Sequence, residues 1–200
     1  MPHENKATPY WSLRDADNCE ILRQGMITDE DIGRGVAADV LPDNPGAEMW
    51  SAGGIPLLSA ADGSEVGPAP SSINFVIWWD GDESRELENG TAISKYGGGT
   101  LQQCDACASN NSTKSTPTLT ADLFGDWREE VIWREADNRG LRLYTTTLPT
   151  QRRIYTLMHD PQYRIAISWQ NVAYNQPPHP SFHIGEGMAA PPQPDIRTAE

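Results

Sequence analysis

The 200-residue chain lacks any run of about 18 apolar residues, which excludes a helix that spans a membrane. Basic residues are scarce: 15 Lys and Arg face 28 Asp and Glu, and a net charge of −13 does not suit nucleic-acid binding. Hydrophobic residues reach only 38%, whereas Gly and Pro number 17 and 16. This composition favours short strands and turns over long helices, so we expect an all-β protein with neither a membrane nor a nucleic-acid partner.

Cysteine is also scarce, and the odd count excludes complete pairing within the chain. The three cysteines are Cys19, Cys104 and Cys107. Cys104 and Cys107 have CxxC spacing, but no second cysteine pair or histidine lies at zinc-finger spacing from them. The sequence therefore favours a local disulfide or two free thiols in a loop over a redox or zinc site.

Two acidic turns share one pattern. Residues 38–50 and 121–133 both read Ala-Asp, three residues, Asp, a short turn, then Glu and an apolar strand. Acids at this spacing, around a turn rich in Gly and Pro, suit a hard cation such as calcium, which prefers oxygen ligands. The candidate ligands are Asp39, Asp43, Glu48, Asp122, Asp126 and Glu130, with Glu129 as an alternative to Glu130.

A second internal similarity supports a repeat architecture. Residues 13–21 match residues 58–66 at Leu, Ala, Asp and Glu, with an offset of 45. The two acidic turns are 83 residues apart, close to twice about 40. Short strands repeating every 40–50 residues or so are typical of propeller blades. The alternative is chance similarity in an acidic, turn-rich chain.

Alternation and β-branched residues predict where the strands lie. The clearest candidates are 74–79, 130–133, 140–145, 152–157 and 164–169. No segment shows an apolar stripe of helical period over about 12 residues, so we predict no helix. Residues 96–115 form a long polar stretch that we interpret as a loop.

Three side chains are candidates for chemistry because of their surroundings. Arg34 stands between two glycines, which allow a ligand or another strand to approach closely. Lys114 lies in a polar turn just before a strand, and Tyr174 lies in a segment dense in amide and aromatic groups. Each also fits a structural role, as a surface cation or as the anchor of a Pro-rich turn.

Long strings in the chain resemble one enzyme family. The most distinctive are Gly-Asp-Trp-Arg-Glu-Glu-Val-Ile at 125–132, Tyr-Thr-Leu-Met-His-Asp at 155–160, and Trp-Gln-Asn-Val-Ala-Tyr-Asn-Gln-Pro-Pro at 169–178. With 31–39, 74–82, 110–117 and 143–150, they resemble the polysaccharide lyase family 11 rhamnogalacturonan lyases. The resemblance implies an eight-bladed, calcium-stabilised β-propeller. Residues 1–200 would then be its C-terminal part, a partial β-propeller of about half the blades, with the upstream blades missing.

The resemblance also implies a site and a reaction. Arg34, Lys114 and Tyr174 match residues that line the family's cleft, and Glu4 matches a ligand of a cleft calcium. The residues implied to bind substrate are Asn110, Asn111, Thr113 and Asn171. The reaction would be calcium-assisted β-elimination at the rhamnose–galacturonate bond of pectic rhamnogalacturonan I. Lys114 and Tyr174 would handle the proton, while Arg34 or Ca2+ would neutralise the uronate carboxylate.

The same resemblance implies a secreted or periplasmic parent enzyme that acts as a monomer. Two features depart from the family pattern: Cys19 replaces a glycine of the blade motif, and residues 97–109 differ. The alternatives are a calcium-stabilised module that only binds carbohydrate, a glycoside hydrolase with two carboxylates, and an inactive remnant with unpaired strand edges. The pairing of Lys114 with Tyr174 favours the lyase, because a scaffold requires neither.

Overall fold

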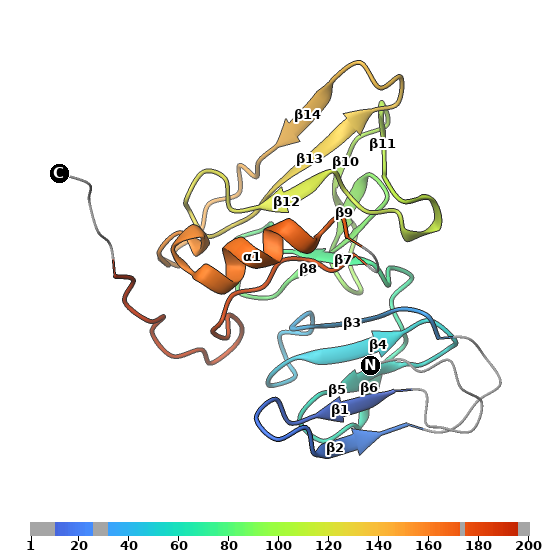
Figure 1. Cartoon of the computed structure of the whole chain (residues 1–200), viewed down its shortest axis with the longest axis vertical. Coiled ribbons are helices and arrows are strands. Elements are labelled where there is room, and N and C mark those ends of the chain that lie inside the picture. The colour runs from blue at the N-terminus through green and yellow to red at the C-terminus, as the bar shows by residue number, and fades with distance from the viewer. Residues whose placement is uncertain (1–10, 26–31, 173–174, 196–200) are drawn as a thin grey trace. The chain divides into compact units, whose positions relative to one another are not determined.

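The computed structural model describes residues 11–25, 32–172 and 175–195. Across these residues, no helix is long and apolar enough to cross a membrane. The chain divides into two compact units, Met1–Ile73 and Asn74–Glu200. Both consist mainly of short antiparallel strands (Figure 1), which confirms the expectation of an all-β protein.

The first unit holds a two-stranded hairpin and a four-stranded meander. The hairpin pairs β1 (Ser12–Arg14) with β2 (Ile21–Gln24). The meander runs in chain order through β3 (Gly35–Ala38), β4 (Glu48–Ser51), β5 (Leu57–Ser59) and β6 (Glu65–Gly67). Residues 13–21 and 58–66, matched in sequence, both form a strand, a turn and the start of the next strand. That similarity therefore reflects a repeated hairpin.

The second unit holds two four-stranded sheets. One is a meander of β7 (Phe75–Ile77), β8 (Glu86–Asn89), β9 (Ala92–Ser94) and β10 (Thr100–Gln103). The other consists of β11 (Cys107–Ala108), β12 (Leu119–Ala121), β13 (Glu130–Glu135) and β14 (Leu141–Tyr144). In that sheet β13 is central, with β14 along one edge and β12 followed by β11 along the other.

A hydrophobic core in the second unit includes residues from both of its sheets. Its buried members are Ile77, Trp79, Ile93, Cys104, Cys107, Val131 and Trp133. Cys104 and Cys107 form a disulfide within this core, which confirms one of the two expected states of this pair. Cys19 is exposed and free.

Two predicted strands were wrong, because the chain there is not extended in a sheet. Residues 152–157 contain no strand, and a 3-10 turn η2 (Leu157–His159) begins at their end. Residues 164–169 lie in a helix, α1 (Pro161–Trp169), which contacts β12 (Figure 1). Apolar residues at every second position from 163 to 169 resembled a strand, yet Ile165 is 61% exposed. The missed signal was Asp160-Pro161, an N-cap followed by proline in the first turn.

The polar stretch 96–115 was interpreted as a loop, but it contains two strands and a 3-10 turn. β10 pairs with β9 and β11 pairs with β13, and η1 (Ser112–Lys114) follows. The side chains of β10 are mostly exposed, because β10 is an edge strand with little to bury. Hydrophobic alternation was therefore absent from a segment that is partly sheet.

Each of the two acidic turns that share a sequence pattern is closed by one glutamate, which accepts hydrogen bonds from the backbone of the turn. Glu48, at the start of β4, accepts hydrogen bonds through Oε2 from the backbone N of Val40 (2.9 Å) and of Leu41 (3.1 Å). Glu130, at the start of β13, accepts equivalent bonds from Leu123 (2.8 Å) and Phe124 (3.0 Å). The repeat seen in the sequence is thus a structural device.

A third copy of this device lies between β7 and β8. Oε2 of Glu86 accepts from the backbone N of Trp79 (2.8 Å) and of Asp80 (3.3 Å). The sequence comparison missed it because Trp78 stands where the other copies have Asp39 and Asp122. Each of the three four-stranded sheets therefore contains one copy of the same glutamate-bound turn.

We expect Glu48→Ala to lower the free energy of unfolding by about 3 kcal/mol, because two backbone N–H groups lose a charged acceptor. Urea unfolding measures the change. Glu48→Gln keeps one oxygen acceptor and should lose less. Glu65→Ala, at an exposed position of β6, is the control. Equal stability of the Glu48→Ala and Glu65→Ala variants would contradict the role assigned to this carboxylate.

Candidate functional site

Lys114 lies in a small closed loop of unusual backbone conformation. A pair of backbone hydrogen bonds joins Asn110 and Thr116 at the base of the loop, 2.8 and 3.2 Å long. Within the loop Asn111, Ser112 and Ser115 have φ of 57°, 51° and 49°. Non-glycine residues rarely adopt positive φ, and such residues concentrate at functional sites. The half-buried Lys114 is therefore held on a tightly constrained backbone.

Asparagine side chains shape this loop. Asn110 donates through Nδ2 to the carbonyl of Pro117 (3.2 Å) and accepts from Nε of Arg134 (3.1 Å). Asn111 donates to Oγ1 of Thr116 (2.9 Å). Both predicted substrate-binding asparagines therefore fix the loop, and their contact with sugar stays a prediction. Thr113 is exposed beside Lys114, as a residue facing substrate should be.

Tyr174 lies outside the described residues, but Gln170 and Asn175 near it in the chain form hydrogen bonds. Gln170 at the end of α1 makes two bonds to the backbone of Thr120, accepting from its N (2.8 Å) and donating to its carbonyl (2.6 Å). Asn175 donates to the carbonyl of Gln170 (2.6 Å), and Arg85 donates to the carbonyl of Pro178 (2.8 Å).

These contacts link the segment that contains Tyr174 to the segment that contains Lys114. Asn171, three residues before Tyr174, donates to the carbonyl of Thr118 (2.9 Å), four residues after Lys114. The structure thus brings the two chain segments together. Gln170 was not among the predicted site residues, since its partner is 50 residues away in the chain.

Arg34, the third predicted catalytic residue, belongs to the first unit. It is half-buried just before β3, and its carbonyl accepts from the backbone N of Ala52 (3.1 Å). Gly33 beside it has φ of 55°, so the neighbouring glycine serves a backbone conformation that L side chains rarely adopt.

A buried charge cluster, which we define as Arg85, Glu88, Glu129 and Tyr163, lies in the second unit. Glu129 accepts from Nη2 of Arg85 (3.2 Å) and from the hydroxyl of Tyr163 (2.7 Å). Glu88 accepts from Oγ1 of Thr120 (2.9 Å), whose backbone binds Gln170. The cluster thus joins β8, the residue before β13, and α1.

Burial dominates the protonation of this cluster. It raises the pKa of Glu88 to about 8, against an ordinary value of 4.5, and also raises the pKa of Glu129. Burial beside Glu129 raises the pKa of the Tyr163 hydroxyl as well. Glu129 belongs to this cluster, so Glu130 and not Glu129 lies in the acidic turn.

Most predicted calcium ligands already bind hydrogen-bond donors. Asp122 accepts from the backbone N of Gly125 (2.7 Å) and of Leu157 (2.8 Å), and Asp126 pairs with Nη2 of Arg128 (2.5 Å). Asp39 is buried, Asp43 is exposed, and Glu4 lies outside the described residues. Calcium takes six to eight oxygen ligands, and oxygens that already face N–H donors do not fit such a site as arranged here. Calcium at these turns stays a prediction of the family resemblance.

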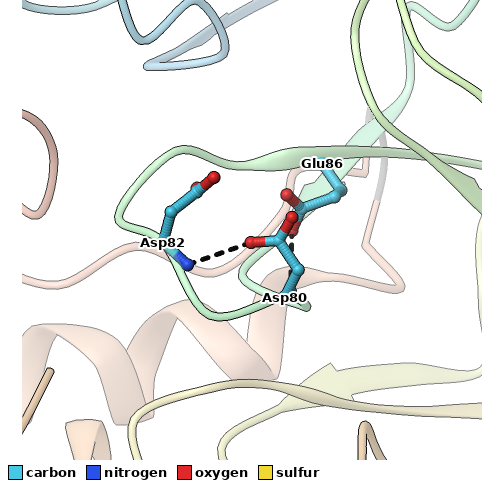
Figure 2. Close-up of side chains that lie close together, drawn as sticks. All are labelled: Asp80, Asp82 and Glu86. Carbon is cyan, nitrogen blue, oxygen red and sulfur yellow. Dashed lines mark hydrogen bonds between the residues drawn. The ribbon is translucent and has the colours of Figure 1, made fainter. Parts of the chain in front are cut away.

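One acidic group could hold a cation. Among the residues that the structure describes, only Asp80, Asp82 and Glu86 bring three carboxylate oxygens within 4.8 Å of one another. Figure 2 shows the three side chains around the turn between β7 and β8. They belong to the third copy of the glutamate-bound turn.

Comparisons with known proteins find the same family that the sequence strings resemble. The model of the rhamnogalacturonan lyase family 11 C-terminal domain matches residues 1–194. The rhamnogalacturonan endolyase YesW of Bacillus subtilis (strain 168) is 52% identical over 203 residues, covering 98% of this chain and 32% of that protein. The rhamnogalacturonan exolyase YesX of the same organism is 46% identical, covering 98% and 36%. The crystal structure of YesW matches with a TM-score of 0.91 at 50% identity, covering 99% of this chain and 34% of that one.

The chain belongs to rhamnogalacturonan lyase family 11 and corresponds to its C-terminal domain. The resemblance drawn from the sequence is therefore confirmed. The chain spans about a third of the length of the curated relatives it matches.

The buried cluster predicts how stability depends on pH. The unfolded chain loses the proton of Glu88 near pH 4.5 and the folded chain keeps it until about pH 8. Stability from this group is therefore full below pH 4.5 and falls as pH rises toward 8. Glu88→Gln keeps an acceptor for Thr120 and should make the fall in unfolding free energy shallower, as measured by urea unfolding across this range.

Glu86, with a pKa raised by burial to about 7, titrates in the same direction, so the fall should shrink and not vanish. Glu20→Gln, at an exposed position, is the control. Parallel pH profiles for the Glu88→Gln and unmodified chains would show that Glu88 does not titrate in this way.

Proposed function

We propose that this chain supplies part of the catalytic cleft of a rhamnogalacturonan lyase, which cleaves the rhamnose–galacturonate bond of rhamnogalacturonan I by β-elimination. The observation that carries the proposal is the link between the Lys114 and Tyr174 segments through Asn171, Gln170 and β12. This link occurs in a chain about half identical to a named rhamnogalacturonan endolyase. A scaffold needs no such convergence of two irregular segments.

The chemistry needs a base and an acid near one sugar bond. A base removes the C5 proton beside the uronate carboxylate, the C4–O bond breaks, a C4=C5 double bond forms, and the leaving oxygen takes up a proton. Lys114 and Tyr174 are the proposed pair for these transfers. Arg34 is the proposed group that neutralises the carboxylate and so stabilises the negative charge of the transition state. Asn110, Asn111, Thr113 and Asn171 are the proposed residues near the sugar hydroxyls.

The proposal includes the architecture of the whole enzyme. Successive four-stranded antiparallel sheets support the assignment to a β-propeller, because radial repetition of such sheets is how a propeller is built. Ca2+ would supply positive charge beside the substrate carboxylate in the cleft, with Glu4 as the proposed ligand from this chain. Pectic rhamnogalacturonan I is the proposed partner, and a monomeric parent that is secreted or periplasmic is the proposed setting.

A module that binds carbohydrate without cleaving it is the second candidate. The exposed loop face around Asn111 and Thr113 would serve binding as well as catalysis. The two functions separate in one assay, because only the lyase creates the unsaturated uronate that absorbs in the ultraviolet.

We expect Lys114→Ala and Tyr174→Phe each to lower, by about 100-fold or more, the rate at which a full-length lyase that carries this domain releases unsaturated product from rhamnogalacturonan I. Ultraviolet absorbance follows the reaction, and circular dichroism checks the fold. Arg139→Ala, at an exposed cation, is the control and should keep the rate. Binding without product would favour the carbohydrate-binding module, and neither binding nor product would overturn the proposal for this chain.

A further inference from the structure

The side-chain ammonium of Lys95, which follows β9, binds the three carboxylates at the turn between β7 and β8. The Nζ atom of Lys95 lies 2.7 Å from Oδ2 of Asp80, 2.6 Å from Oδ2 of Asp82 and 2.9 Å from Oε1 of Glu86. We propose that the Lys95 ammonium occupies the cation position of this acidic turn permanently, so that the turn neither needs nor binds calcium. This inference is independent of the proposed lyase reaction, which uses none of these four residues.

The hydrogen-bond count supports an ammonium at this position. A lysine ammonium has three N–H donors and no acceptor, and each donor here has one carboxylate oxygen. Nζ of Lys95 therefore already binds one oxygen of each of the three carboxylates that could hold a metal ion (Figure 2). A calcium ion would have to displace Lys95, and would meet its positive charge while doing so.

The other two glutamate-bound turns differ at this position. Oε1 of Glu48 accepts from Nδ2 of Asn44 (2.6 Å), and Oε1 of Glu130 accepts from Oγ1 of Thr145 (2.9 Å). Both donors are neutral, whereas Oε1 of Glu86 accepts from a cation. The three sheets thus share the glutamate-bound turn. The second glutamate oxygen binds a neutral donor in two of them and an ammonium in the third.

The backbone around Lys95 fits this role. Lys95 follows β9 directly, and its N and carbonyl bond to Gly99 (3.2 Å) and Gly98 (3.0 Å) in the tight turn before β10. A Cβ at Gly98 would lie 2.9 Å from Cβ of Lys95, so the absence of a side chain leaves room for the lysine stem. The neighbouring Gly97 has φ of 66°.

The ionisable groups of the turn shift one another's pKa, and burial raises the pKa of Glu86 to about 7. The carboxylates raise the pKa of Lys95, although burial opposes this, and Lys95 helps to hold the pKa of Asp80 low. Removal of the ammonium would leave three carboxylates close together without compensation, which is the arrangement that attracts a divalent ion.

The test is to remove the ammonium and ask whether calcium replaces it. We expect Lys95→Ala to melt at a lower temperature in EDTA than the unmodified chain, and to bind one more calcium per chain by isothermal titration calorimetry. Calcium should restore its melting temperature. The double variant Lys95→Ala with Asp82→Asn should lose that extra site. Arg139→Ala removes a cation from an exposed pair with Asp137 and should gain no site.

Equal calcium stoichiometry in the unmodified and Lys95→Ala chains would overturn the proposal. Amine labelling of the unmodified chain provides a second test that requires no variant to fold. The labelling rate of Lys95, read by mass spectrometry, should be slow in the folded chain and equal in calcium and in EDTA. A rise in calcium would show that the ion displaces the ammonium, and the proposal would fail.

Discussion

A buried glutamate closes one turn of each four-stranded sheet: the turn between β3 and β4, between β7 and β8, or between β12 and β13. Where a strand ends, its next backbone N–H groups have no strand partner, and Glu48, Glu86 and Glu130 each bind two of them with one oxygen. Because the carboxylate sits on the neighbouring strand, the turn is tied to the register of the sheet. The second oxygen then decides what else the turn can hold.

The second carboxylate oxygen of each of these glutamates binds a different kind of donor in each sheet. Its partner is Asn44, Lys95 or Thr145, depending on the sheet. Acid-rich turns that look alike in sequence therefore differ in electrostatics.

The proposed site depends on the same region of β13. Glu129 and Glu130 are adjacent, yet Glu130 binds the turn whereas Glu129 binds Arg85 and Tyr163. Tyr163 belongs to α1, whose last turn leads to Gln170 and its bonds to β12. Residues on both sides of the undescribed positions 173–174 are thus held by this region, Gln170 by β12 and Pro178 by Arg85.

The sequence alone determined the all-β class, the repeated hairpins and the family, because turn chemistry and long strings are properties of neighbouring residues; it left Cys104 and Cys107 as a disulfide or two free thiols, and the structure shows the disulfide. It failed for α1, where apolar residues alternated as in a strand, and for the third turn, where Trp78 replaces an aspartate. The bonds of Gln170 to Thr120, of Asn171 to Thr118, and of Lys95 to Asp80 join residues 15 to 53 positions apart. Only the tertiary structure decided these, because such contacts depend on how the strands pair and not on spacing along the chain.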